Sequence, residues 1–127
     1  DVLAPCAIGG IVNPRTIPML RAPIIAGGAN NVLDDERRDG ETLSNRGINY
    51  APDYVINAGG LINVYSELKG YGRDKAMLDS ANIFDTVKRV INKAKVEGVT
   101  TVMAANRVAE ERINTVHRLK RVWLAPR

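Results

Sequence analysis

The chain has 127 residues, of which 45% are hydrophobic and 25% charged, and it carries a formal net charge of +4. This length is typical of one domain with a single core. No apolar run approaches the roughly 18–20 residues that a membrane-spanning helix needs, so we expect no membrane span and no membrane partner. The single cysteine, Cys6, excludes an internal disulfide, and no signal peptide is visible. We therefore expect a cytoplasmic protein.

Short apolar runs and short helical stretches alternate through the first half of the chain. Thr16 can cap one short helix, and Asp34 or Asp35 can cap a second helix that ends at Gly47. Apolar strands at this spacing are typical of a parallel sheet with crossover connections, so we predict an α/β fold. The three predicted strands are residues 2–4, 24–26 and 48–51.

The second half is predicted to be helical from about Ala58 almost to its end. Residues 73–97 carry apolar side chains at helical spacing, and Gly98 ends that helix. Thr100 or Thr101 then begins another helix. We expect one structural unit with two parts, residues 1–57 with the sheet and residues 58–127 with the helices.

Small or amide residues follow each predicted strand, in residues 4–7, 27–31 and 57–60. Turn chemistry alone can explain any one of these segments. In a parallel sheet, however, ligands bind outside the carboxyl ends of the strands. Small side chains let a flat ligand approach the backbone, and amides offer both donors and acceptors. Three such segments on successive strands therefore favour a ligand site.

Other common sites are missing from the sequence. No G-x-G-x-x-G segment follows a strand, and no His, Cys, Asp or Glu cluster has the spacing of a metal site. No nucleophile with a neighbouring base can be assigned. We expect His117 to lie on the surface, and Cys6 to be a small residue at a strand end rather than a nucleophile.

Several basic residues lie near the end of the chain, from His117 to Arg121 and at Arg127. Such a tail could contact nucleic-acid phosphates, and its binding would then fall steeply with salt. No aromatic residues interleave with these charges to stack on bases. We expect a solvated terminus and no nucleic-acid partner.

Four segments together resemble one family. They are residues 4–7, residues 29–31, "YAPDYVINAGGLINV" from residue 50 and "AANRVAEERI" from residue 104. They are similar to the C-terminal part of the Glu/Leu/Phe/Val dehydrogenases, and to the leucine dehydrogenase branch in particular. The resemblance covers nearly the whole chain. It implies the second half of a Rossmann NAD-binding domain, followed by helices that return across the cleft.

The resemblance also implies that part of the enzyme lies outside this chain. The catalytic lysines, an aspartate and the Gly-rich loop of the family would lie upstream of Asp1, so we assign no catalytic residue here. The chain begins within a predicted strand, and we expect a fragment that is inactive alone. The intact enzyme would be a homo-oligomer.

Seven positions match family positions with a role at the site. Asn57 matches an asparagine between the nicotinamide and the substrate. Val87 and Val90, three residues apart on one helix face, match positions that line the side-chain pocket of the branched-chain enzymes. Valines would leave a glutamate carboxylate buried and unpaired, so they favour an aliphatic substrate, although plain core packing is the alternative. The resemblance assigns cofactor contacts to Cys6, Ala7, Ala29, Asn30 and Asn57, and substrate contacts to Asn57, Val87 and Val90.

The expected function is thus oxidative deamination of a branched-chain L-amino acid by an NAD-dependent dehydrogenase. The product would be a 2-oxo acid and ammonia. One alternative from another class stays open: a half-Rossmann module that binds a ligand or supports assembly without catalysis.

Overall fold

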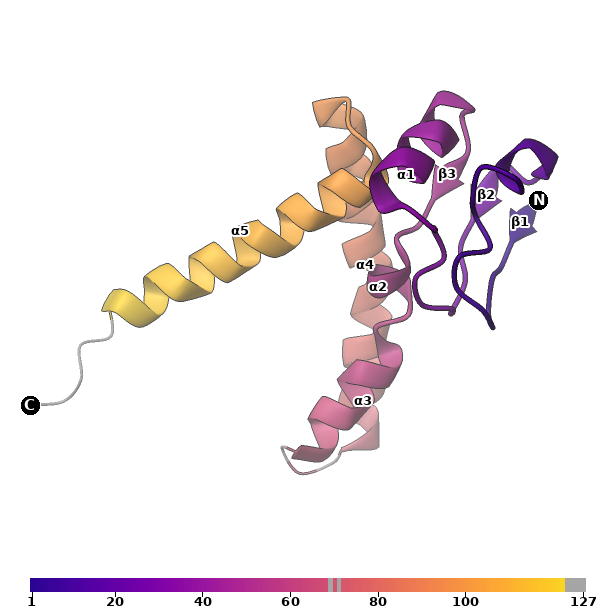
Figure 1. Cartoon of the computed structure of the whole chain (residues 1–127). Helices are drawn as coiled ribbons and strands as arrows, with labels where there is room; N and C mark the ends of the chain where they lie inside the picture. The colour runs from indigo at the N-terminus through magenta and orange to yellow at the C-terminus, as the bar shows by residue number, and fades with distance from the viewer. Residues whose placement is uncertain (69, 71, 123–127) are drawn as a thin grey trace, which may run out of the picture.

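The computed structural model describes residues 1–68, 70 and 72–122 (Figure 1), so Arg127 of the basic tail lies outside the described residues. Strands, a short 3₁₀ helix and one α-helix make up the first half, and four α-helices follow. In chain order the elements are β1 (Val2–Leu3), η1 (Ile17–Met19), β2 (Ile24–Ile25), α1 (Glu36–Asn45), β3 (Asn49–Tyr50), α2 (Asp53–Ile56), α3 (Gly59–Leu68), α4 (Arg73–Glu97) and α5 (Thr101–Val122).

The three strands within the described residues form one parallel sheet in the order β1-β2-β3. Ile24 of β2 is in register with Val2 on one side and with Asn49 on the other. The backbone pairing extends beyond the two-residue strands, because the Ala26 N–H donates to the Leu3 carbonyl at 3.0 Å. The predicted α/β fold with parallel strands is confirmed.

A first core lies between the sheet, α1 and the beginning of α5. Ile25, Leu43 and Val102 are among its buried members. Helix α1 carries Gly40 in its middle, which propensity alone disfavours. A Cβ at Gly40 would lie 3.4 Å from Val102 Cγ2, so this position faces the contact between α1 and α5.

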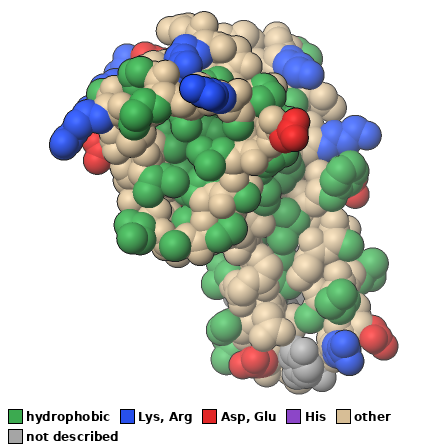
Figure 2. Space-filling model, turned by 90° about the vertical axis from the view of Figure 1, so that its right-hand side faces the viewer, with side chains coloured by type: hydrophobic (Ala, Val, Ile, Leu, Met, Phe, Trp, Pro, Cys, Tyr) green, Lys and Arg blue, Asp and Glu red, His purple; other side chains and the backbone are tan. Residues whose placement is uncertain are grey.

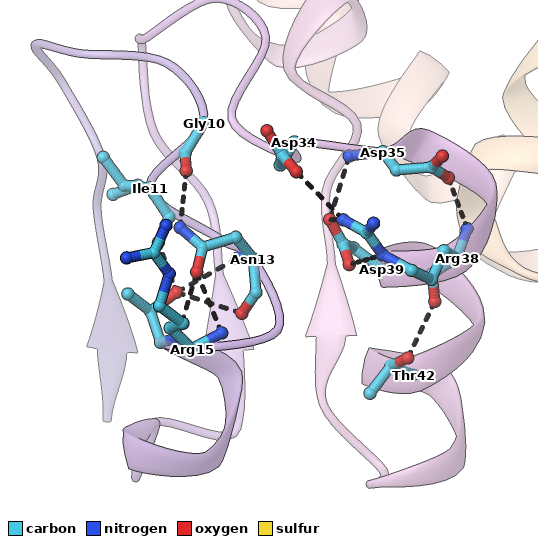
Figure 3. A network of polar contacts seen from close by, with 10 residues as sticks. Gly10, Ile11, Asn13, Arg15, Asp34, Asp35, Arg38, Asp39 and Thr42 are labelled. Atoms are coloured by element: carbon cyan, nitrogen blue, oxygen red, sulfur yellow. Dashed lines mark hydrogen bonds and ion pairs between the residues drawn. The ribbon is translucent and has the colours of Figure 1, made fainter.

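The start of α1 is fixed by three acidic side chains and one arginine (Figure 3). Asp35 caps the helix, since its carboxylate accepts the Arg38 N–H at 2.7 Å. Asp39 is 1% exposed, accepts the Asp35 N–H at 2.9 Å and pairs with Arg38. Burial by itself would raise the pKa of Asp39, but the hydrogen bonds from Arg38 and from the backbone hold it below its ordinary value.

Helices α4 and α5 meet at what we call the α4–α5 elbow, the turn at residues 98–100 with the two helix ends that it joins. Gly98 ends α4 in the left-handed conformation at φ 63°, as predicted. From this elbow α5 extends away from the rest of the molecule (Figure 1). A second core of Val90, Ala94, Ala104 and Ala105 fills the contact between the two helices.

Apolar side chains remain exposed around the sheet. Figure 2 shows many of them gathered on the side of the molecule that carries β1. Val2 is 55% exposed and Ile8 74% exposed. Among the described residues, no helix is long and apolar enough to cross a membrane.

Candidate functional site

The segments that follow β1 and β2 pack closely against each other. The Ala29 N–H donates to the Pro5 carbonyl at 2.9 Å, and the Gly10 N–H donates to the Asn31 carbonyl at 2.7 Å. Asn31 adopts a left-handed conformation at φ 52°, which asparagine tolerates better than most residues. A Cβ at Gly27 would lie 2.1 Å from the Pro5 carbonyl oxygen, so only glycine fits there. The first two strand ends therefore form one surface.

Asn57 joins the third strand end to this surface. It is the C-cap residue of the short helix α2, which follows β3. Its side-chain Nδ2 donates to the Asn30 side-chain oxygen and, at 3.4 Å, to the Ala29 carbonyl. Three of the positions predicted to bind a cofactor, Ala29, Asn30 and Asn57, are thus in direct contact although 28 residues separate the first from the last. We call this cluster, with the glycines beside it, the strand-end site.

The direction of these hydrogen bonds leaves one donor and one acceptor available. The Ala29 carbonyl can only accept, so it fixes Nδ2 of Asn57 on its side. Asn57 Oδ1 and Asn30 Nδ2 have no hydrogen-bond partner among the residues that the structure describes. Asn30 is exposed and Asn57 partly exposed, and an amide acceptor and an amide donor are the two groups that a primary carboxamide can pair with.

Three glycines at the strand-end site have open space where a side chain would be. A Cβ at Gly28, Gly59 or Gly60 would meet no atom of the chain within 4 Å, and none of the three has a positive φ. Gly27, in contrast, is required by the approach of Pro5. The fold therefore explains Gly27 but gives no reason for the other three, which are the glycines that a ligand or another part of a larger protein would need.

The remaining cofactor positions have different surroundings. Cys6 and Ala7 are exposed in the segment after β1, and the Cys6 thiol is free. Ala29 is only 4% exposed, so it faces the core with its methyl group and offers its carbonyl to Asn57. Within the described residues, no group of three or more His, Cys, Asp and Glu side chains could hold a metal.

The two predicted substrate positions lie on α4. Val90 is 1% exposed and belongs to the second core, against α5, while Val87 is partly exposed. In this chain Val90 is a packing residue, as the alternative interpretation of the sequence allowed. Its predicted contact with a substrate stays a prediction, and of the two valines Val87 is the more accessible.

A buried carboxylate, Asp53, lies one helical turn before Asn57, and sequence reasoning missed it. It is 7% exposed and accepts the Val32 N–H at 3.0 Å. The signal was present, because residues four apart on a helix share a face and Asp53 and Asn57 have that spacing. Only the structure shows that the shared face meets residues 29–32.

Two tyrosines surround Asp53. Burial raises the pKa of Tyr50, and the negative charge of Asp53 raises it further. Burial is the main reason, and the negative charge of Glu36 the second, why the pKa of Tyr54 rises to about 12. The Tyr54 hydroxyl donates to Asn106 Oδ1 at 2.7 Å, which ties α2 to α5. Both hydroxyls are therefore protonated at neutral pH, and of the two the Tyr54 hydroxyl donates to Asn106 while the Tyr50 hydroxyl accepts the Asp53 N–H.

Known proteins match nearly the whole chain. The family model described as Glutamate/Leucine/Phenylalanine/Valine dehydrogenase matches residues 1–121. An L-tryptophan dehydrogenase from Nostoc punctiforme is 55% identical over 120 residues, which are 94% of this chain and 34% of the relative. A leucine dehydrogenase from Geobacillus stearothermophilus is 50% identical over 124 residues, 98% of this chain and 34% of the relative.

Solved structures agree with this match. The L-tryptophan dehydrogenase from Nostoc punctiforme superposes with a TM-score of 0.90 at 55% identity, over 93% of this chain and 35% of that chain. A hetero-hexameric glutamate dehydrogenase from Thermus thermophilus shares the fold alone, with a TM-score of 0.69 at 23% identity over 98% of this chain and 30% of that chain. The chain thus spans about a third of the length of its relatives. It belongs to the Glu/Leu/Phe/Val dehydrogenase family of amino-acid dehydrogenases.

Proposed function

We propose that this chain is part of an NAD-dependent L-amino-acid dehydrogenase that converts an apolar L-amino acid to its 2-oxo acid and ammonia. The observation that carries the proposal is the Asn30–Asn57 pair at the meeting point of three strand ends. In a parallel sheet this edge is where ligands bind. The family assignment makes a nicotinamide cofactor the natural ligand.

The residues present suit such a cofactor. The free acceptor on Asn57 and the free donor on Asn30 complement the carboxamide of a nicotinamide. Gly28 leaves the backbone bare for a flat ring, and Cys6 and Ala7 add small exposed side chains. When bound, the cofactor supplies the carbon that accepts the hydride. The chain's own part is to bind and orient, and the catalytic groups belong to the rest of the enzyme.

For the substrate we propose a branched-chain aliphatic side chain. Val87, partly exposed on α4, offers apolar contact without a hydrogen bond, and Val90, three residues on, is buried against α5. A glutamate carboxylate would have no partner on this face and would pay its full desolvation. Leucine, valine and isoleucine differ by about 1–3 kcal/mol at most in such a pocket, so activity on all three is expected.

L-Tryptophan is the second candidate substrate. The observation that favours it is the 55% identity to an L-tryptophan dehydrogenase, against 50% to a leucine dehydrogenase. An aromatic ring would also be accepted by an apolar valine face if the rest of the pocket leaves room for it.

We also propose how the two parts of the chain are used in the intact enzyme. Residues 1–57 would be the second half of the cofactor-binding domain, and residues 58–127 the helices that pack back across the cleft. The intact enzyme would be a cytoplasmic homo-oligomer. The competing proposal is a module that binds a ligand or supports assembly without turnover.

The test is NADH formation by the full-length gene product with L-leucine, L-valine, L-isoleucine, L-phenylalanine, L-tryptophan and L-glutamate. We expect turnover of the branched-chain acids and little with L-glutamate. Turnover confined to L-tryptophan or L-phenylalanine would keep the reaction and reject the aliphatic pocket. No turnover with any of them, together with retained NADH binding, would favour the module.

A further inference from the structure

Helix α2 is attached to residues 29–32 at two points that lie one turn apart. At its C-terminal end, Asn57 donates to Asn30 and to Ala29. At its first residue, the Asp53 carboxylate accepts the Val32 N–H at 3.0 Å. A helix of this length has almost no stability of its own, so these two attachments set where its side chains lie.

The attachment at Asp53 is made by a buried carboxylate that binds backbone N–H groups. Its second carboxylate oxygen accepts the N–H of Tyr54 at 2.7 Å, and the Asp53 N–H itself donates to the Tyr50 hydroxyl at 3.2 Å. Among the described residues no Lys, Arg or His pairs with this 7% exposed carboxylate. Backbone N–H groups alone therefore stabilise its charge. A charged acceptor holds an N–H at shorter range and more strongly than a neutral one.

Both carboxylate oxygens are needed at this position. An asparagine has one acceptor oxygen, and its NH₂ group would face either the Val32 or the Tyr54 N–H with no bond to make. Since a donor that loses its acceptor is costly, either residues 29–32 would move away from α2, when Val32 loses the bond, or the first turn of α2 would shift, when Tyr54 loses it; both change how α2 sits against residues 29–32. Ala29 and Asn30, which contact Asn57, belong to that segment.

We infer that Asp53 is a positioning residue that holds the Asn30–Asn57 pair in its working geometry. It acts through the Val32 N–H and not by contact with a substrate or cofactor. The inference rests on the function proposed above for that pair. Asp53 lies within the segment from residue 50 that carries the family resemblance, and the structure distinguishes it by its burial and by its bond across 21 residues of sequence.

The test compares two isosteric substitutions in the full-length gene product. Asp53→Asn removes one acceptor beside the strand-end site. Asp39→Asn is the matched control, since Asp39 is also a buried carboxylate that accepts a backbone N–H, but it does so within the first turn of α1. Circular dichroism gives the folded fraction of each variant at the assay temperature, and kcat is then expressed per folded molecule.

We expect Asp53→Asn to lower kcat per folded molecule by about tenfold or more, because misplacing a positioning group by about 1 Å costs up to about 100-fold. Asp39→Asn should leave kcat per folded molecule within about twofold of that of the unmodified enzyme. In the Asn57→Ala background, adding Asp53→Asn should lower kcat per folded molecule by less than about twofold, because the effect of Asp53 passes through Asn57. Equal loss in both backgrounds, or an Asp53→Asn enzyme with full kcat per folded molecule, would overturn the inference.

Crystal structures of the two variants keep the inference testable if the gene product shows no dehydrogenase activity. We expect the hydrogen bond between Asn57 and Asn30 to be broken or lengthened in Asp53→Asn and intact in Asp39→Asn. An unchanged Asn30–Asn57 pair in Asp53→Asn would overturn the positioning role. Absence of activity in the unmodified protein would instead overturn the proposed function.

Discussion

The strand-end site and the α4–α5 elbow are held together by different forces. At the site, short backbone and amide hydrogen bonds and one buried carboxylate join segments that glycines allow to approach closely. At the elbow, small buried alanines are flanked by ion pairs, in which Lys93 lies 2.7 Å from Glu97 and 2.8 Å from Glu111. The first set joins particular atoms at hydrogen-bond distance. The second sets a helix direction and is open to screening by salt.

The largest effect should come from breaking the closest approach at the site. Gly27→Ala places a Cβ against the Pro5 carbonyl, and we expect it to cost about 3 kcal/mol or more because the backbone must shift. Gly28→Ala, which meets no atom within 4 Å, should change the free energy of unfolding by less than about 1 kcal/mol. Urea denaturation of both variants measures the difference, and equal losses would contradict the packing described for Gly27.

Next in size is a cavity at the elbow. Val90→Ala removes two methyl groups from a 1% exposed position and should cost about 2 kcal/mol. Val96→Ala, on the same helix but 85% exposed, is the control and should cost less than about 0.5 kcal/mol. A negligible loss for Val90→Ala, with a changed preference among amino-acid substrates, would show that Val90 serves the substrate more than the core.

A smaller effect is expected where the two regions are linked. Tyr54→Phe deletes the hydroxyl that donates to Asn106 and should cost about 1 kcal/mol. Since the folded protein raises the pKa of Tyr54 from 10.0 to about 12, the Tyr54 contribution is complete below pH 10 and is lost as the pH rises from 10 toward 12. Thermal unfolding of both proteins across this range checks the sign. A difference between wild type and Tyr54→Phe that grows with pH would contradict it.

The smallest effect should come from the elbow's ion pairs. Glu111→Gln removes one partner of Lys93 at a position whose side chain is 65% exposed. We expect a loss of stability smaller than those of Gly27→Ala, Val90→Ala and Tyr54→Phe, and a loss reduced further in about 1 M salt, where the screening length falls to about 3 Å. Glu110→Gln, a neighbouring exposed glutamate, is the control. A loss that persists in high salt would mean that the elbow depends on more than charge.

Much of the fold was predictable from local sequence signals. The cap at Asp34 or Asp35, which is Asp35 in the structure, the helix over residues 73–97 and its end at Gly98 all follow from side chains within one turn of the feature that they set. The parallel sheet followed from short apolar runs with helical stretches between them. The strands proved shorter than the apolar runs, although backbone hydrogen bonds such as those from Ala26 to Leu3 and from Ala51 to Ile25 continue past the strand ends.

The sequence could not predict which residues far apart along the chain are in contact. The bonds from Asp53 to Val32 and from Tyr54 to Asn106 join residues 21 and 52 positions apart, and no local pattern predicts them. The i,i+3 spacing put Val87 and Val90 on one face, but the same spacing serves a core and a pocket equally well. For the glycines, the sequence showed a need for small residues without showing which of them the fold itself requires.

The most direct test of the strand-end site as a nicotinamide site is NADH binding by the full-length gene product with Gly28→Leu. A Cβ at this position would meet no neighbouring atom within 4 Å, so we expect little change in the melting temperature and a dissociation constant for NADH raised by about tenfold or more, because the side chain would occupy the ring's space. Gly72→Leu, at another position without close contacts, should bind NADH as the unmodified protein does. Unchanged NADH binding by the Gly28→Leu protein would contradict a cofactor at this edge of the sheet.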